Sequence, residues 1–248
     1  MIFLISAITA FFAGFLKTGF GIGGGFFLTP LLTLVMPPIE AVGLITPMML
    51  ITDLFTVRLF WRQMDISQIL LLVPGCLLGT VLGGYYLFKA SSSSVETGIG
   101  VIAIVFAGVF MYSRANPSLY NKWNPKPYHG ILISVLAGFT SSVAHSGGII
   151  LIIYFLAKGF EKEGLIANMV GILLLSDLVK FPIFLINGFL DEQMIFLAII
   201  LMPLLFMGSW LGHRLVERLN SRNYGLMLAV IVLICGLILL TDPQELLF

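Results

Sequence analysis

Long apolar runs constrain this chain more than any other feature of its sequence. Runs of about 20 mostly apolar residues recur along all 248 positions, and each is long enough to cross a bilayer as a helix. Hydrophobic residues make up 59% of the chain and charged residues only 10%, whereas soluble domains carry roughly 25% charged residues. The sequence therefore predicts an all-α polytopic membrane protein without a separate soluble domain.

Polar, proline or glycine breaks divide the apolar runs into ten segments. The segments cover residues 2–18, 22–36, 41–60, 67–88, 96–113, 130–144, 147–157, 164–187, 193–212 and 224–240. The second and seventh are short for a full span, and each follows a glycine cluster. Each is therefore expected to be half of a broken helix or a re-entrant hairpin, which gives eight to ten membrane segments.

The two halves of the chain resemble each other. At an offset of 124 positions, residues 13–15, 23–24 and 52–54 match residues 137–139, 147–148 and 176–178. At an offset of 129, Pro74, Gly79 and residues 82–83 match Pro203, Gly208 and residues 211–212. We interpret the pattern as a duplication, with a first membrane repeat at residues 1–113, a cytoplasmic linker at 114–128 and a second repeat at 129–248.

An odd number of segments in each half gives the second repeat an inverted topology. If the N-terminus is outside, the cytoplasmic loops collect ten of the thirteen basic residues and the outer loops receive only Lys89. The ten are Arg58, Arg62, Arg114, Lys122, Lys126, Lys158, Lys162, Arg214, Arg218 and Arg222. Because Lys and Arg favour cytoplasmic loops, both termini are predicted to lie outside. Inverted repeats with broken helices are typical of secondary transporters, and a duplicated structural bundle is the alternative.

Each repeat has one polar, glycine-rich break, at residues 17–25 and 140–148. Unpaired backbone in hydrocarbon costs several kcal/mol per group, so such a stretch must line a cavity or be covered by protein. A helix that starts after the break points its free N–H groups and about half a positive charge at the site, which favours an anion. The glycines expected to form this site are Gly21, Gly23, Gly24, Gly147 and Gly148. Close helix packing is the alternative role for any one of them. A nucleotide loop is excluded because no G-K-[ST] follows.

Four ionisable residues inside membrane segments are functional candidates by default. Lys17 lies one turn before the first glycine cluster and is expected either to bind an anionic substrate or to extend to the membrane interface. Asp53 and Asp177 occupy equivalent repeat positions, and Lys180 follows Asp177 at i+3 on one helical face. These groups form either a structural ion pair or the carrier of a coupling proton.

His145 occupies the position in the second break that Gly21 occupies in the first, with Ser141, Ser142 and Ser146 beside it. An imidazole there either hydrogen-bonds a substrate oxyanion or is satisfied by a backbone carbonyl. The His and Cys spacing matches no metal motif, so no metal, cofactor or catalytic residue is expected. The net charge of +1 gives no sign of a nucleic-acid partner, and we expect none.

The G-x-G-G-G end of the first helix, the following apolar half with Pro30, the G-G break after His145 and the paired T/S-D-L motifs resemble the sulfite exporter TauE/SafE family of bacterial inner-membrane permeases. The resemblance covers nearly the whole chain. It implies transport of sulfite, sulfonates or related organosulfur anions through an inverted-repeat helical fold without a cofactor. The five glycines named above would line the substrate path. The residues His145 and Ser146 depart from a plain glycine run, which leaves the exact substrate open.

The sequence therefore predicts a secondary transporter that moves small anions across the bacterial cytoplasmic membrane by alternating access. Its expected partners are a small anionic substrate, the lipid bilayer and a coupling proton or sodium ion, and its oligomeric state stays open. A passive anion channel is the alternative function. A membrane-embedded hydrolase is a further one, although the intramembrane ionisable residues form no acid–base or metal set at helical spacing.

Overall fold

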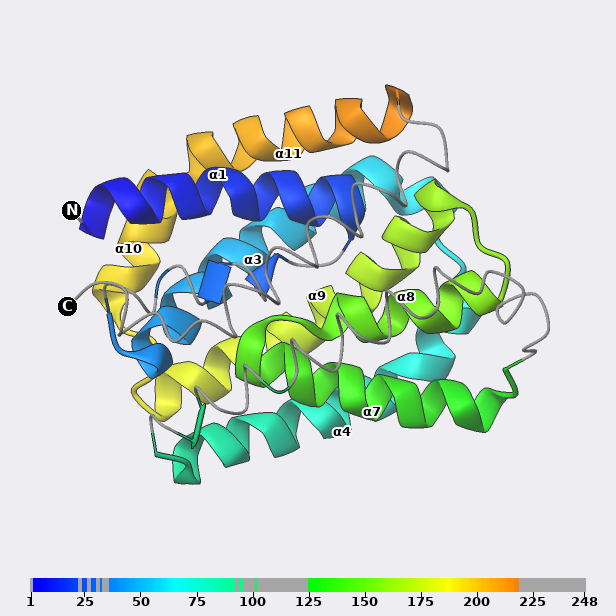
Figure 1. The fold of residues 1–248 in the computed structure, drawn as a ribbon, viewed down its shortest axis with the longest axis horizontal. Coiled ribbons are helices and arrows are strands. Elements are labelled where there is room, and N and C mark those ends of the chain that lie inside the picture. The colour runs from blue at the N-terminus through cyan, green and yellow to red at the C-terminus, as the bar shows by residue number, and fades with distance from the viewer. Residues whose placement is uncertain are drawn as a thin grey trace.

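The computed structural model in Figure 1 describes residues 2–21, 24, 25, 28, 29, 32, 36–91, 94, 95, 101 and 125–218. Its elements are α1 (Ile2–Phe20), α3 (Pro38–Phe60), the 3-10 turn η1 (Trp61–Gln63), α4 (Ile66–Lys89), α7 (Pro127–Ala144), α8 (Gly147–Ala157), α9 (Lys162–Ile186), α10 (Glu192–Ile200) and α11 (Met202–Arg218). The predicted all-helical class is confirmed for this part of the chain. The predicted segments 22–36, 96–113 and 224–240 lie wholly or mainly outside the described residues.

Three of the described helical stretches are long and apolar enough to cross a membrane: residues 38–63, 66–89 and 162–186. They correspond to the predicted segments 41–60, 67–88 and 164–187. Their outer faces are apolar as well; α4, for example, exposes Leu70, Leu78 and Phe88. Apolar side chains facing outward on long helices are the arrangement that a lipid solvent requires.

The predicted segment 193–212 is two helices rather than one. α10 and α11 meet at an angle of 54° with only Leu201 between them. Pro203 explains the break: its ring would clash with the carbonyl of Ile199 in a continuous helix, and it has no N–H to donate. A proline is tolerated in the first turn of a helix, so α11 starts at Met202.

The helices are arranged as two close pairs with two further helices between them (Figure 1). α1 lies beside α11, and α4 lies beside α7; α3 contacts the first pair, α9 contacts the second, and α3 and α9 contact each other. Each pair thus joins the first helix of one half of the chain to the fourth segment of the other half. Neither pair is made of neighbours in sequence.

Glycines allow these pairs to approach closely, at positions related by the sequence offsets. A Cβ at Gly14 would touch the carbonyl of Leu205 and lie 2.8 Å from Ser209 N. A Cβ at Gly138 would touch the carbonyl of Cys76 and lie 2.8 Å from Thr80 N. Gly14 and Gly138 differ by 124 positions, while Cys76 and Thr80 differ from Leu205 and Ser209 by 129. The two helix contacts therefore use corresponding residues, with small residues where backbones meet.

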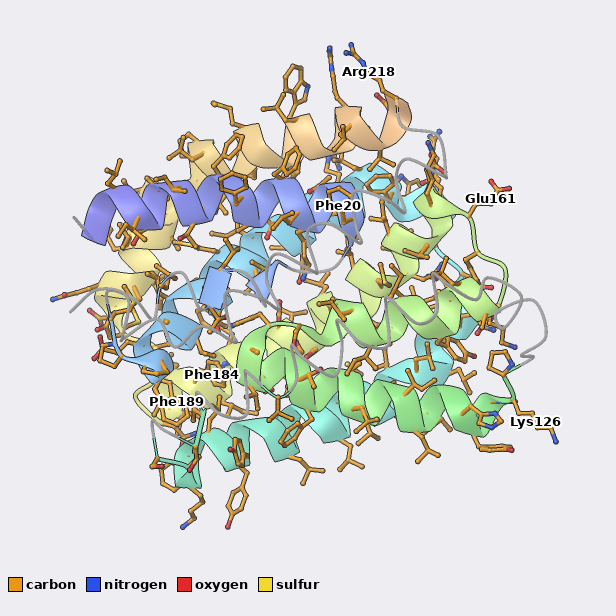
Figure 2. The ribbon with its side chains drawn as sticks, viewed as in Figure 1. Phe20, Lys126, Glu161, Phe184, Phe189 and Arg218 are labelled. Atoms are coloured by element: carbon orange, nitrogen blue, oxygen red, sulfur yellow. The ribbon has the colours of Figure 1, made fainter. Side chains whose placement is uncertain are left out.

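α7 and α8 form a hairpin. Figure 2 shows Lys126, before α7, and Glu161, after α8, at the same end of the molecule, so α8 returns toward the end from which α7 starts. The 11 residues of α8 extend for about 16 Å at 1.5 Å per residue, roughly half the hydrocarbon thickness. Of the two arrangements expected for the seventh segment, a broken span or a hairpin, the geometry matches the hairpin.

The helices before the two breaks end in the same way. His145 follows α7 with φ of 49°, and its N–H donates to Ser141 O over 3.0 Å. Gly21 follows α1 with φ of 69°, and its N–H donates to Lys17 O over 2.8 Å. A residue in the left-handed conformation cannot continue a right-handed helix, so the chain turns at both places.

Candidate functional site

Four buried charged side chains meet where α1, α3 and α9 come together. Lys17 Nζ lies 2.7 Å from Asp53 Oδ1 and 4.0 Å from Asp177 Oδ2, and Lys180 Nζ lies 2.6 Å from Asp177 Oδ1. None of the four exposes more than 2% of its side chain. We call Lys17, Asp53, Asp177 and Lys180 the charge cluster. With all four ionised, its two positive and two negative charges cancel.

The fold brings the cluster together through the packing of α3 against α9. Asp53 lies within α3 and Asp177 within α9, and the packing of these helices places both carboxylates within 4.0 Å of Lys17 Nζ. Lys17, one turn before the end of α1, reaches both carboxylates from the third side. Buried ions require such partners because they lose their hydration in the low-dielectric interior, and only nearby opposite charges and hydrogen bonds can offset that cost.

Lys180 uses all three of its N–H bonds. Besides Asp177 Oδ1, its Nζ lies 2.9 Å from His145 Nδ1 and 3.1 Å from Ser141 O. An ammonium group has three donors and no acceptor, so no N–H bond of Lys180 remains for a further ligand. The lysine therefore holds α9 to the end of α7.

Lys17 is bonded less completely. Its distance of 4.0 Å to Asp177 is beyond hydrogen-bond range, which leaves Asp53 as its one close acceptor among the described residues. On the acceptor side, neither oxygen of the buried Asp53 carboxylate receives a hydrogen bond from the described residues, and Asp177 Oδ1 receives none either. The Lys17–Asp53 pair thus has unused hydrogen-bonding capacity on both partners, whereas Lys180 has further acceptors at Ser141 and His145.

His145 joins the cluster to α3. Its Nδ1 accepts from the Lys180 ammonium, and its Nε2 lies 3.0 Å from Val42 O. Nε2 also lies 3.3 Å from Thr46 Oγ1. A carbonyl can only accept, so this set of partners fits a neutral imidazole with its proton on Nε2. Of the two roles expected for His145, the bond to a backbone carbonyl is present.

The three predicted serines have different surroundings. Ser141 lies in the cluster, with its carbonyl and its hydroxyl, at 3.4 Å, both near Lys180 Nζ. The hydroxyl of Ser142 donates to Thr80 O on α4 over 2.8 Å, and that of Ser146 donates to Thr140 O over 3.2 Å. The hydroxyls of Ser142 and Ser146 are therefore engaged by backbone away from the charges.

The glycines of the two breaks are buried against other helices. A Cβ at Gly21 would lie 2.5 Å from Met169 Cε, and one at Gly24 would lie 3.1 Å from Leu16 Cδ1. Gly147 has no room for a side chain beside Ala137 O and Ser141 Cβ. Gly148, the second residue of α8, is also buried, whereas Gly23 lies outside the described residues.

The two breaks touch at a residue that the sequence did not single out. A Cβ at Gly25 would lie 2.6 Å from Ala144 O and 2.8 Å from His145 Cα. The backbone at the end of the first break therefore contacts the backbone of the second break. Only tertiary packing creates this contact between the two breaks.

Sequence reasoning also missed buried hydroxyl pairs beside the charges. Thr18 and Thr56 lie 2.7 Å apart, and Thr80 and Ser176 lie 2.6 Å apart. A signal for Thr56 was present, because it follows Asp53 by three positions as Lys180 follows Asp177. Each hydroxyl is small enough to line a polar site and can turn to donate or accept.

The arrangement as a whole can hold an anion and a proton. As far as the described residues show, Lys17 supplies an ammonium with unused donors and Asp53 supplies a carboxylate that receives no hydrogen bond, and both are buried in the bundle. No group of three His, Cys, Asp or Glu side chains close enough to hold a metal ion occurs among the described residues. The chemistry of the site is therefore that of charge and hydrogen bonding.

Paired charges inside a bundle of apolar helices define the class: a multi-pass helical membrane protein with a buried polar cluster. The family model described as sulfite exporter TauE/SafE matches residues 6–239, so the chain belongs to this family. The resemblance seen in the sequence is thereby confirmed. Members of the family are membrane transporters of sulfite-like anions, so the chain is a transporter and not an enzyme. Neither the curated proteins nor the solved structures contain a match.

Proposed function

We propose that the protein is a secondary transporter that moves sulfite, sulfonates or related organosulfur anions across the bacterial cytoplasmic membrane by alternating access. The observation that carries this proposal is the charge cluster at the helix breaks, with Lys17 paired to Asp53 at 2.7 Å. Charged groups inside a membrane are costly and serve ion pathways more often than stability. A transporter needs a binding group that can be released again, and a lysine with unused donors is such a group.

The substrate site of the proposal lies around Lys17, between the two breaks. We assign Gly21, Gly23 and Gly24 of the first half to it, although Gly23 lies outside the described residues, and from the second half we assign Ser141, Ser142, His145, Ser146, Gly147 and Gly148. The contact of Gly25 with Ala144 and His145 supports a shared site, because it brings the two breaks together. Broken helices that meet near the midplane are the usual way to build such a site.

The proposal includes two inverted repeats, residues 1–113 and 129–248, joined by a cytoplasmic linker. Corresponding glycines in the α1–α11 and α4–α7 contacts support it, as do the matching helix ends at Gly21 and His145. In alternating access, one part of the bundle rocks against another around a fixed site. The two close helix pairs are suitable rigid parts because glycine contacts hold each pair tightly.

The proposed orientation places both termini outside. In Figure 1 the end of the bundle where α7 begins and α11 ends is opposite the end that holds the N-terminus and the end of α4. The former end carries Lys126 and Arg218, and the latter carries Lys89. Because basic residues favour the cytoplasm, the end with Lys126 is the cytoplasmic one.

Flux into proteoliposomes tests this function. Purified protein is reconstituted, and uptake of sulfite and of a sulfonate is followed under imposed pH or sodium gradients, with protein-free liposomes as the blank. We expect uphill accumulation that depends on one of the gradients. Flux that only follows the substrate's own gradient would indicate a passive anion channel, and no flux of either sulfite or the sulfonate would refute the proposal.

Gly147→Leu serves as a matched variant. A leucine side chain there would collide with Ala137 O and Ser141 Cβ, beside the proposed site. We expect this variant to insert into the membrane but to lose transport. Leu156→Val, at an exposed apolar position of the same helix, is the control and should retain transport.

A further inference from the structure

We propose that Asp53 binds the coupling proton and that its protonation frees Lys17 to bind the substrate anion. The inference rests on the proposed function and names the coupling ion and its residue. The Asp177–Lys180 pair, in contrast, is a fixed support that does not exchange ligands. The two repeat-related aspartates thus have different roles.

The first argument is charge balance. The buried cluster holds Lys17, Lys180, Asp53 and Asp177, whose charges sum to zero. A singly charged anion that enters this site leaves one uncompensated negative charge in a low-dielectric interior, which is strongly unfavourable. Uptake of one proton by a carboxylate restores neutrality. The balanced cluster therefore favours joint entry of one proton with each negative charge.

The second argument is the distribution of hydrogen bonds. All three N–H bonds of Lys180 have acceptors, so this lysine has no donor for a substrate. Within the described part of the chain, Lys17 has one close acceptor, and neither oxygen of the buried Asp53 carboxylate receives a hydrogen bond. A proton on Asp53 supplies the missing hydrogen for its contact with the Asp177 carboxylate. An anion on Lys17 supplies the missing acceptor.

The groups that face Asp53 come from three directions. Lys17 faces it from α1, and Asp177 with Lys180 behind it faces it from α9. His145, at the break after α7, contacts Lys180 rather than Asp53. From α11, which packs against α3, His213 contacts Phe60, and Phe60 lies about two turns along α3 from Asp53. Lys17 is thus the cation whose attraction the proton on Asp53 would weaken.

The proposed step is balanced in charge and atoms. A proton from water on the open side adds to an oxygen of Asp53 and leaves the carboxyl group neutral. The Lys17 ammonium stays protonated, loses the attraction of the carboxylate and hydrogen-bonds an oxygen of the substrate. On the other side of the membrane the anion leaves Lys17, the proton returns to water, and the Lys17–Asp53 ion pair forms again.

The test compares wild-type protein with Asp53→Asn in proteoliposomes that take up sulfite. Wild-type uptake should respond to acid outside, and a difference of one pH unit should drive about a tenfold accumulation if one proton accompanies each anion. In Asp53→Asn, Lys17 binds the anion without a proton. Uptake should then ignore the pH gradient and respond to an inside-positive potential instead, with about 60 mV driving about a tenfold accumulation.

Two further variants act as controls. Asp53→Glu keeps a titratable carboxyl group and should keep the response to the pH gradient. Asp191→Asn changes an aspartate that caps α10 outside the cluster, and it should behave as wild type. Comparison with these variants also removes the effect of pH on the substrate itself, because all of them receive the same sulfite.

The outcomes separate this inference from the proposed function. If wild-type protein accumulates sulfite but Asp53→Asn still follows the pH gradient, the role of Asp53 is wrong while the transporter stands. If wild-type protein moves neither sulfite nor a sulfonate, the proposed function itself fails. If Asp53→Asn does not fold, the inference is tested by the number of protons that enter with each sulfite in the wild type. Accumulation that needs sodium but no proton overturns the inference.

Discussion

Gly21 and His145 end their helices in the same left-handed conformation, although one is a glycine and the other is the largest polar side chain of its break. Their φ angles are 69° and 49°, and each N–H donates to the carbonyl four residues earlier. Glycine adopts this conformation without penalty, whereas most other residues lose about 1 to 2 kcal/mol. His145 therefore occupies a strained position, and its contacts with Lys180 and Val42 explain how it stays there.

This relationship predicts an unusual order of stability for substitutions at position 145. His145→Gly should be more stable than His145→Ala by about 1 kcal/mol, because only the alanine keeps the left-handed strain. Both should be less stable than wild type, since Lys180 loses the Nδ1 acceptor. The measurement is thermal unfolding in detergent. Ala144→Gly, one residue earlier and still helical, is the control and should be destabilising.

Lys17 and Asp53 should depend on each other. Lys17→Met leaves the Asp53 carboxylate buried without its counter-ion and should lower the free energy of unfolding by about 3 to 5 kcal/mol. The double variant Lys17→Met/Asp53→Asn removes both charges and should recover most of that loss without recovering transport. Unfolding in detergent and sulfite flux measure the two effects. Equal stability of the single and the double variant would contradict the ion pair.

Gly14→Ala and Gly138→Ala should lower the stability of the protein by similar amounts. An added Cβ meets backbone atoms of α11 or α4, including Ser209 N and Thr80 N at 2.8 Å, which cannot move without shifting a helix. We expect each variant to lose about 1 to 3 kcal/mol of stability, the usual range for overpacking. Gly164→Ala, with a side-chain atom of Phe160 at 3.3 Å as its nearest neighbour, should cost nothing. A large effect at only one of the two glycines would contradict the correspondence of the helix pairs.

The contribution of Asp65 to stability should depend on pH. It precedes α4, and hydrogen bonds from the Ser67 hydroxyl and from the N–H groups of Gln68 and Ser67 lower the pKa of its carboxyl group. A lowered pKa in the folded state means that the cap contributes fully above the unfolded value of about 3.9 and is lost as the pH falls through the folded value. Asp65→Ala should therefore cost about 1 kcal/mol at neutral pH and less in acid.

That pH effect is measured as the difference in unfolding temperature between wild type and Asp65→Ala across a pH series. Asp65→Asn is the matched variant, because asparagine is also a good cap but does not titrate. It should remain close to wild type in stability and show no change in its capping contribution with pH. A constant difference between Asp65→Ala and wild type down to strongly acid pH would refute the assignment.

The orientation can be checked by cysteine labelling. Lys126 and Lys89 are exposed and lie at opposite ends of the bundle. In a background without Cys76 and Cys235, Lys126→Cys should react with an impermeant maleimide only after the cytoplasmic side is opened, and Lys89→Cys should react in intact cells. Reaction of both from the same side would reject the topology.

Most helix positions could be read from the sequence, because a long apolar run in a membrane protein has few alternatives to a helix. The predicted segments 41–60 and 164–187 differ from α3 and α9 by no more than three residues at either end. The break between α10 and α11 was missed, although Pro203 marks it. In that segment the apolar pattern continued across the proline, and the prediction followed the pattern.

The site could be predicted only in part. Asp177 and Lys180 lie three positions apart on one helix, so their pairing follows from the helical repeat. Lys17 and Asp53 are on separate helices, and nothing local indicates that they meet at 2.7 Å. The bond between His145 and Lys180 likewise depends on how α7 packs beside α9. Sequence patterns indicate which residues belong inside the membrane, whereas tertiary packing decides which of them touch.

The two shortest ion pairs of the charge cluster each lie within one half of the chain, and only the longer contact between Lys17 and Asp177 joins the halves, which has a consequence for how the protein is made. Lys17 and Asp53 both precede residue 60, and Asp177 and Lys180 are on the same helix. When the first half has been synthesised, both Lys17 and Asp53 are present. Neither charge is therefore left unpaired in the membrane until the second half is made. We expect the two halves, expressed as separate polypeptides divided between residues 114 and 128, to insert independently and assemble in the membrane. Rapid degradation of the first fragment even in the presence of the second would show that this self-sufficiency is absent.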